Sequence, residues 1–239
     1  MLVSTSGIVL SKIKYGDSDL IVKCYTKEHG VVGFLLRNIL KTKKGKLNKA
    51  YFLELSQLHL QILLKPNRSL QIIKEAKLEH QYIDLHSNVL KSAIVLFLSE
   101  ILNNVLKEEE KNELLYDYLE ATLLWLDVHQ NFANFHLLFL TKLTKHLGFY
   151  PDETDIEFDY FNLEEGKFQS QIQGVHVISG ENLTLLKQLL GTTFDALHVI
   201  KINANQRQSF LNMMLLYFKL HLGNFRSPKS LTVLNQVFN

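Results

Sequence analysis

The residues of this sequence whose types and spacing best suit chemistry are cations gathered in one short stretch. Arg37 is followed by five lysines, namely Lys41, Lys43, Lys44, Lys46 and Lys49. Lysines on a flexible loop that contains Gly45 suit binding to the phosphates of a nucleic acid without recognition of its base sequence. We therefore interpret this stretch, residues 37–49, as a DNA-binding lysine loop. The alternative interpretation is a solvated surface loop, which is what most lysine runs are.

The positive charge is concentrated in the first third of the chain. Residues 1–80 carry fourteen lysines and arginines against six aspartates and glutamates, a formal charge of +8. Residues 81–239 carry twelve against eighteen, a formal charge of −6, so the whole chain is close to neutral at +2. A polyanion is the partner expected for such a cationic segment. We add Lys12 and Lys14 to the predicted DNA contacts for this reason.

Aromatic residues near these cations offer the other contact that nucleic acids use, which is stacking on bases. Four candidates lie in the cationic segment: Tyr15, Tyr25, Phe34 and Tyr51. Such aromatic residues more often belong to the core of a small sheet. We predict stacking for Tyr15 because it lies beside a turn.

Other chemistries find little support in the sequence. The single cysteine, Cys24, excludes an internal disulfide and a multi-cysteine zinc site, and its place in a strand pattern predicts a small core residue. The ten histidines show no ligand spacing. Nothing resembles a nucleophile elbow, a phosphate-cradling glycine loop or a paired-carboxylate site. We expect no catalytic residue, no metal and no cofactor.

Five apolar runs with a period of two predict the sheet that positions the lysine loop, and they span residues 2–12, 18–26, 31–36, 51–64 and 70–78. Gly16 and Gly30 supply turn chemistry between the first three runs, and Pro66 does so before the last. The alternation changes phase near Ser56 and Gln57, which predicts a β-bulge. Five short, bent strands predict an OB-type barrel.

Helical spacing dominates the rest of the chain. Apolar residues predict helices at about 88–106, 112–127, 131–147 and 205–222, with a shorter helix after Gly180. The acidic, aromatic and glycine-punctuated residues 153–177 predict a hairpin or ribbon. Ser227 and Pro228 predict the N-cap and first residue of a last short helix. The fold class is therefore α+β.

At four places the chain resembles the RecO recombination mediators of bacteria. These places are Gly7-Ile8-Val9-Leu10 with Tyr15-Gly16-Asp17-Ser18-Asp19 and Thr26-Lys27-Glu28-His29-Gly30, the basic loop after Arg37, the helix exit Leu147-Gly148-Phe149-Tyr150-Pro151-Asp152, and the C-terminal Tyr217-Phe218, His221-Leu222, Phe225-Arg226 and Lys229-Ser230-Leu231. They occur in the family's order and span nearly the whole length.

The resemblance implies an N-terminal OB domain, residues 1–80, and a helical domain, residues 81–239, with residues 153–177 as a small ribbon insertion. It also implies an activity: binding single- and double-stranded DNA, annealing complementary strands and, with RecR, helping RecA to replace single-stranded DNA-binding protein (SSB). The family also binds the acidic, Phe-ended C-terminal tail of SSB. Many relatives hold zinc in the insertion with four cysteines, and this chain has none there. We therefore predict a ribbon that is zinc-ribbon-like in shape, metal-free and held by aromatic packing.

A groove between the aromatic helices 131–147 and 205–222 is one place where the SSB tail would bind. Lys142, Lys145 or Arg207 would then receive its carboxylates. Core packing explains the same aromatic residues without any groove. Neither a signal peptide nor a membrane-spanning segment is evident, so we expect a cytoplasmic protein.

We hypothesise a DNA-binding and strand-annealing mediator that is not an enzyme. One alternative is a protein-interaction adaptor whose barrel binds peptides instead of nucleic acid. The other is an enzyme, for example a nuclease or transferase, whose site is scattered along the sequence. The lack of clustered ligands argues against the enzyme.

Overall fold

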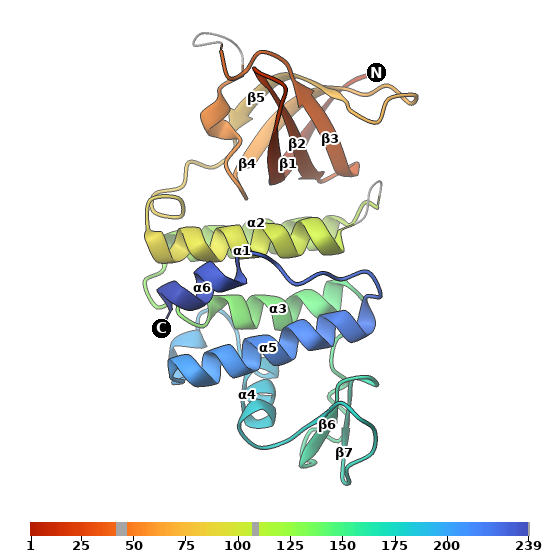
Figure 1. Ribbon diagram of the computed structural model, residues 1–239, viewed down its shortest axis with the longest axis vertical. Helices are drawn as coiled ribbons and strands as arrows, with labels where there is room; N and C mark the ends of the chain where they lie inside the picture. Colours follow the sequence, from red (N-terminus) through yellow and green to blue (C-terminus); the bar gives the residue numbers. More distant parts are fainter. Residues whose placement is uncertain (42–46, 107–109, 239) are drawn as a thin grey trace. The chain divides into compact units, whose positions relative to one another are not determined.

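A computed structural model describes residues 1–41, 47–106 and 110–238, and it confirms the predicted α+β fold class (Figure 1). The chain divides into two compact units. Unit 1 comprises Met1–Val128 and Pro228–Ser230, and unit 2 comprises His129–Ser227 and Leu231–Asn239. This grouping by contacts does not decide whether residues 1–80 fold alone, so the predicted domains 1–80 and 81–239 stay a prediction. Among the described residues, no helix has the length and apolar character that crossing a bilayer requires.

The predicted five-stranded sheet is present in unit 1. Its strands are β1 (Leu2–Tyr15), β2 (Asp19–Thr26), β3 (Gly30–Leu36), β4 (Gln57–Leu63) and β5 (Ile72–Leu78). Their order is β3-β2-β1-β4-β5, and every neighbouring pair is antiparallel. The alternating runs therefore located each strand to within a few residues, except at the start of β4.

The sheet is not the closed barrel that we expected. Across the gap between its edge strands, the described residues form one parallel bridge, from Phe34 to Gln71. The Gln71 N–H donates to the Gly33 carbonyl at 2.8 Å, and the Leu35 N–H donates to the Gln71 carbonyl at 3.1 Å. The Gln71 side chain also bonds to the backbone of the turn at Lys65. The segment at Gln71 is thus held in a turn. In a closed barrel, this segment would continue as a strand paired with β3.

The bulge predicted near Ser56 is present in the backbone hydrogen bonds. Leu55 has a left-handed φ of 58°, its N–H donates to the Val9 carbonyl at 2.7 Å, and the Val9 N–H donates to the Ser56 carbonyl at 3.0 Å. Leu55 and Ser56 therefore both lie opposite Val9, which is the arrangement of a bulge whose first residue is left-handed. The predicted strand was wrong only before this point, because residues 49–51 form a short 3-10 helix and the regular strand β4 begins at Gln57. Further register shifts lie between Val9 and Ser11 and between Gln61 and Ile62.

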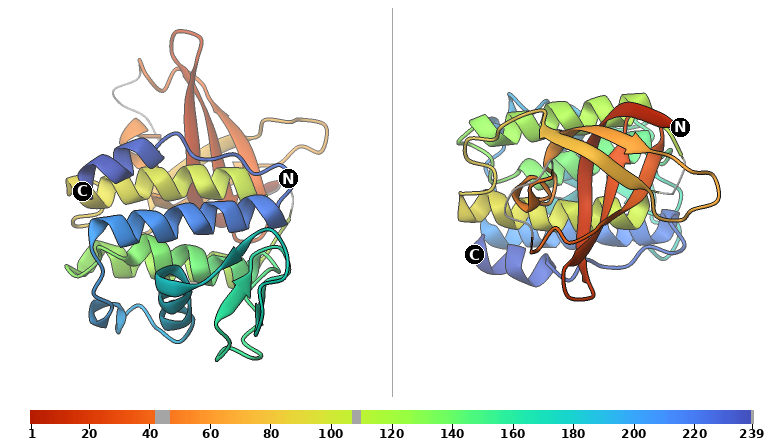
Figure 2. Two further views of the ribbon diagram at one scale, coloured as in Figure 1. Left: turned by 60° about the horizontal axis from the view of Figure 1, so that its bottom comes forward. Right: turned by 90° about the horizontal axis from the view of Figure 1, so that it is seen from above.

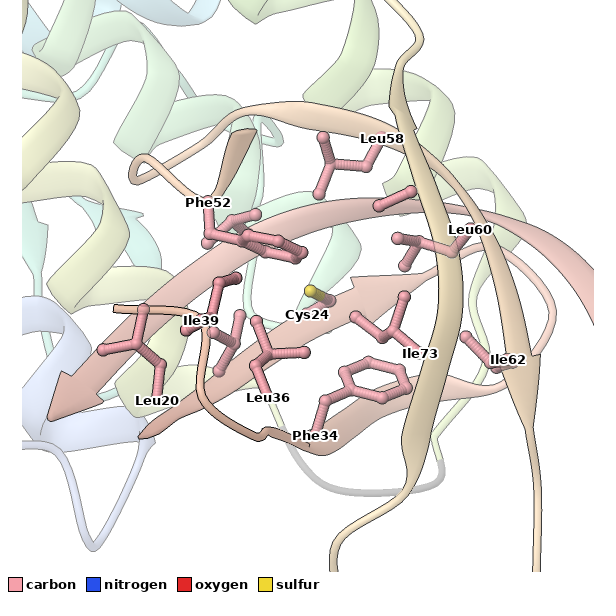
Figure 3. Close-up of a cluster of buried hydrophobic side chains, with 13 residues drawn as sticks. Leu20, Cys24, Phe34, Leu36, Ile39, Phe52, Leu58, Leu60, Ile62 and Ile73 are labelled. Carbon is pink, nitrogen blue, oxygen red and sulfur yellow. The ribbon is translucent and has the colours of Figure 1, made fainter. Parts of the chain in front are cut away.

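The concave face of the sheet holds one apolar core, drawn in Figure 3. Its thirteen buried residues include Leu20, Phe34, Leu60 and Ile73, which come from four different strands. Cys24 lies at the centre of the labelled group and has no exposed surface, which confirms its assignment to the core.

The opposite face of the sheet is buried against two helices, α1 (Val89–Val105) and α2 (Glu113–Val128). Ile8 and Tyr25 are cross-strand partners, so their side chains share a face, and both are buried. The Tyr25 hydroxyl donates to the Asn112 carbonyl at 3.0 Å, and the Gln57 amide donates to the Glu120 carbonyl at 3.2 Å. The middle of the sheet is therefore covered on both faces.

A buried polar cluster ties the segment after β5 to these helices. Lys91 has no exposed surface, and its ammonium group donates to the Asp127 carbonyl at 2.6 Å and pairs with Asp84 at 3.0 Å. The Asp127 carboxylate accepts from the backbone N–H groups of Ile83, Asp84 and Leu85. The ion pair fixes how this segment packs, because a buried charge left without its partner is costly.

Unit 2 combines helices with a small three-stranded sheet. Its elements are α3 (Phe135–His146), β6 (Tyr160–Asn162), β7 (Lys167–Gln169), β8 (Val177–Ile178), α4 (Gly180–Leu190), a 3-10 helix (Leu197–Val199), α5 (Ala204–His221) and α6 (Leu231–Val237). The strand order is β7-β6-β8. Phe161 packs on Phe168 with ring centroids 4.8 Å apart and on Tyr217 at 6.0 Å. Aromatic packing thus attaches the predicted ribbon to α5.

The predicted start of the last helix was wrong by several residues. We placed the N-cap at Ser227 and the first helical residue at Pro228, whereas α6 begins at Leu231. The Ser230 N–H donates to the Glu100 carboxylate at 3.1 Å. This bond and the grouping of Pro228–Ser230 with unit 1 postpone the helix, and neither is visible in a local sequence pattern.

Two glycines with the same backbone conformation give a matched test of packing in unit 1. Gly30 and Gly16 have φ values of 62° and 58°. A Cβ at Gly30 would lie 2.8 Å from the Glu110 backbone, whereas none of the described atoms lies within 4 Å of one at Gly16. Gly16→Ala should cost about 1–2 kcal/mol of unfolding free energy from backbone strain. Gly30→Ala should cost about 1 kcal/mol or more beyond that, measured by urea denaturation. Equal losses for the two variants would show that Glu110 does not pack there.

Candidate nucleic-acid interface

Two turns at one end of the sheet are bonded together. The Asp19 carboxylate accepts from the Asn38 N–H at 2.7 Å, and the Leu40 N–H donates to the Ser18 carbonyl at 3.0 Å. The Ser18 hydroxyl donates to the Asn38 side-chain oxygen at 3.0 Å. The β1–β2 turn and the turn after β3 therefore form one structural feature, although they are about twenty residues apart in sequence.

This feature carries four of the predicted DNA contacts on exposed positions: Lys14, Tyr15, Arg37 and Lys41. We call these four residues the turn surface. Ile39, between the two cations of the second turn, is only 4% exposed and belongs to the core of the sheet. The core thus anchors the second turn while Arg37 and Lys41 extend into solvent.

Tyr15 is the one of the four aromatic candidates that is available for stacking. Its exposed fraction is 56%, whereas Tyr25 and Phe34 are buried and Tyr51 packs against the core. Successive residues of a strand point to opposite faces, so Tyr15 and Lys14 lie on opposite faces of the hairpin end. A base stacked on Tyr15 would approach the hairpin from the face that carries Tyr15. The turn that carries Arg37 and Lys41 is bonded to the β1–β2 turn next to it.

The other predicted contacts are placed differently. Lys12 is half-buried and pairs with Glu54 at 3.1 Å, so its charge is already compensated. Lys49 is exposed in the 3-10 helix. Lys43, Lys44 and Lys46 lie outside the described residues.

Two further cations were missed by the sequence analysis. Lys65 and Arg68 are exposed on the turn between β4 and β5. Both were counted in the charge of residues 1–80, but the Pro66 turn signal led us to treat them as a connection only. The sequence did contain a signal for them: the two cations flank Pro66-Asn67. Two cations on a tight turn are presented to solvent together, which indicates a candidate binding surface.

Two further kinds of site chemistry, metal binding and a reactive cysteine, lack support in the described part of the chain. No group of three or more histidine, cysteine, aspartate or glutamate side chains there is arranged to hold a metal ion. Burial raises the pKa of the Cys24 thiol far above its ordinary value, so this cysteine is not a thiolate nucleophile.

The three candidate partner contacts in unit 2 have different surroundings. The Lys142 ammonium donates to the Leu190 carbonyl at 2.8 Å, and burial lowers its pKa. Lys145 is exposed on α3. Arg207 is half-buried, donates from Nε to the Asn134 side-chain oxygen at 3.1 Å and lies 5.8 Å from the Phe238 ring centre.

Arg207 lies in an open groove of about 510 Å³ within unit 2. The groove is also lined by His198 and Lys201, which are exposed, and by Asn203 at the start of α5. Its described lining contains no acidic residue. The N-terminal end of a helix adds positive potential, so the groove is suited to an anionic group.

Comparisons with known proteins match both parts of the chain. The family model described as "Recombination protein O N terminal" matches residues 1–82, and "Recombination protein O C terminal" matches residues 86–231. A protein named DNA repair protein RecO from Christiangramia forsetii is 45% identical, and the match covers all of both chains. Proteins of that name from Flavobacterium psychrophilum and Bacteroides fragilis are 38% and 36% identical, also over the full length of each chain.

The bond between the two turns predicts a local effect of Asp19. Asp19→Ala removes the acceptor of the Asn38 N–H, so exchange of the Asn38 and Leu40 amide hydrogens should accelerate about 5–10-fold, equivalent to about 1–1.5 kcal/mol of local opening. Amide exchange followed by NMR measures this. Asp17→Ala in the same turn is the matched control and should leave both rates unchanged. Equal acceleration in both variants would contradict a specific role of the Asp19 carboxylate.

Proposed function

This chain belongs to the RecO family of DNA repair proteins, and on that premise we propose that it is a mediator of DNA repair and recombination which binds DNA and anneals complementary strands. It acts on both single- and double-stranded DNA in the cytoplasm. It works by binding rather than by a catalytic step of its own.

The observation that carries this proposal is the turn surface. Its cations come from two turns that are bonded to each other, and they are exposed. Exposed lysines and arginines on fixed turns contact phosphates of any sequence. Neutralised strands repel each other less, so base pairing nucleates more readily between strands bound by the protein.

The proposal extends to the loading of recombinase. In company with RecR, the protein assists RecA to replace SSB on single-stranded DNA, as the resemblance to the family implies. The acidic C-terminal tail of SSB binds the groove around Arg207. In support, the groove combines Arg207 and Lys201 with the start of α5, and no acidic residue is among its described lining. Lys142 contributes little because its ammonium group already bonds to Leu190.

The turn surface predicts a charge-dependent loss of DNA binding. Arg37→Glu with Lys41→Glu should weaken the affinity for single-stranded DNA at least about 10-fold in low salt. If the two wild-type cations each neutralise one phosphate, the slope of log K against log salt should become less steep by about 1.4. Fluorescence anisotropy of a labelled oligonucleotide measures both, and the rate of pairing between complementary strands should fall in parallel.

Lys167→Glu with Lys219→Glu is the control, because both lysines are exposed in unit 2 and the net charge changes equally. Unchanged binding and annealing in the turn-surface variant would favour the alternative of an adaptor whose sheet binds peptides.

The Arg207 groove predicts that the tail of SSB binds through its charge. Arg207→Glu, and separately Lys201→Glu at an exposed position, should each weaken binding of an SSB tail peptide about 10-fold. Isothermal titration calorimetry measures the affinity, and a peptide whose C-terminal carboxylate is amidated should lose binding to the unmodified protein. Lys219→Glu on the exposed surface of α5 serves as the control. An SSB tail that binds all three variants equally must bind elsewhere.

A further inference from the structure

The β4–β5 hairpin lies directly on the edge of β3 in unit 1. A Cβ at Gly33 would lie 3.1 Å from Leu70 Cδ2 and 3.7 Å from the Ser69 carbonyl oxygen. The absence of a side chain at Gly33 thus permits the hairpin to approach β3 closely. The two hydrogen bonds of Gln71 to Gly33 and Leu35 hold it there.

The hairpin is ordered by bonds at both of its ends. The Gln71 side chain accepts from the Lys65 N–H at 2.8 Å and donates to the Arg68 carbonyl at 2.6 Å. The Leu64 N–H donates to the Met1 carbonyl at 2.9 Å, and the N-terminal amine donates to the Leu64 carbonyl at 2.8 Å. Lys65 and Arg68 are therefore presented on a fixed turn, so little backbone entropy is lost when they bind a ligand.

The hairpin and β3 enclose a groove of about 600 Å³. Val31, Val32 and Leu64 contribute apolar lining. Three lysine and arginine side chains line it too: Lys65, Arg68 and Lys111. Glu28, the one acidic residue in its described lining, accepts a hydrogen bond from the Thr5 hydroxyl. Lys111 pairs with Glu113, whereas neither Lys65 nor Arg68 forms an ion pair within the described residues.

The groove and the turn surface lie at opposite ends of β1. Leu2 pairs with Leu63 at one end of this strand, next to Lys65, and Tyr15 pairs with Asp19 at the other end. Measured along its backbone, a strand of 14 residues is about 46 Å long at 3.3 Å per residue. In Figure 2 the β1–β2 turn and the β4–β5 hairpin project in different directions from the sheet. The two cationic surfaces are thus separate.

We propose that the groove between β3 and the β4–β5 hairpin is a second binding site for a single strand of nucleic acid, so that one chain holds two strands at once. This inference rests on the proposed annealing function and names the surface that takes the second strand. Lys65 and Arg68 contact its phosphates, and the partly exposed Val32 and Leu64 contact its sugars and bases. A strand bound there is kept apart from a strand on the turn surface until pairing begins.

The geometry favours nucleic acid over an extended peptide. A peptide that adds a strand to a sheet needs free backbone groups on the edge strand. The Gly33 carbonyl and the Leu35 N–H already bond to Gln71, and Val31 is only 5% exposed. A phosphate backbone needs only the exposed cations, which a fixed hairpin already presents.

The test uses the full chain with Lys65→Glu and Arg68→Glu together, and the Lys167→Glu, Lys219→Glu protein as the charge control. Titration of a labelled oligonucleotide at concentrations well above the dissociation constant counts the strands bound per chain. The unmodified protein and the control should bind two strands per chain, and the hairpin variant one. The same variant should pair complementary strands at least about 10-fold more slowly, while the remaining strand binds within about 3-fold of the unmodified affinity.

The outcomes separate this inference from the proposed function. A hairpin variant that binds two strands and anneals like the control overturns the second site and leaves the annealing function intact. An unmodified protein that does not accelerate pairing refutes the annealing function, while its strand count still decides the inference. Loss of binding to an acidic peptide, with the strand count unchanged, assigns the groove to a protein partner and overturns the inference. If the glutamate variant melts at a lower temperature, Lys65→Gln with Arg68→Gln repeats the count.

Discussion

Burial of the sheet on both faces is the constraint on which the other features of unit 1 depend. Around Gly7 to Leu10, alternate residues of β1 enter the core of the sheet or pack toward α1 and α2. Gly7 fits because a Cβ there would lie 2.9 Å from Leu60 Cδ1. With both faces covered at the middle of the sheet, a ligand can reach only its turns and edges. The turn surface and the groove beside the β4–β5 hairpin both lie at these accessible turns and edges.

The same constraint explains why helices α1 and α2 group with the sheet. They cover the outer face through the bonds of Tyr25 and Gln57, and the buried Lys91 cluster fixes the segment that leads into α1. A buried ion pair contributes little net stability, but leaving one partner alone costs several kcal/mol. Such a cluster therefore selects one packing of the segment against the helices. The turns and edges are then held on a frame with a single arrangement.

The sequence allowed prediction of what depends on local patterns. Alternation located the strands, Gly16 and Gly30 occupy the left-handed positions that their turns require, and Cys24 is in the core. What depends on contacts distant in sequence was missed. The bond from Asp19 to Asn38 joins two turns whose sequences carry no sign of each other, and Gln71 holds a turn where a barrel would close. Lys65 and Arg68 were overlooked because a turn pattern says nothing about the groove beside it.

The division of charge along the chain bears on how such a protein could release its product. Residues 1–80 have a formal charge of +8 and the remainder −6, yet screening at physiological salt confines each field to about 8 Å. The acidic remainder therefore does not cancel the attraction of exposed cations for a strand in contact with them. Because each exposed lysine or arginine contributes a salt-dependent phosphate contact, a few per strand give binding that is fast and reversible. On the proposed annealing function, base pairing makes the pairing step itself favourable. Because each strand is held by only a few reversible phosphate contacts, the duplex then dissociates and the surfaces can bind new strands.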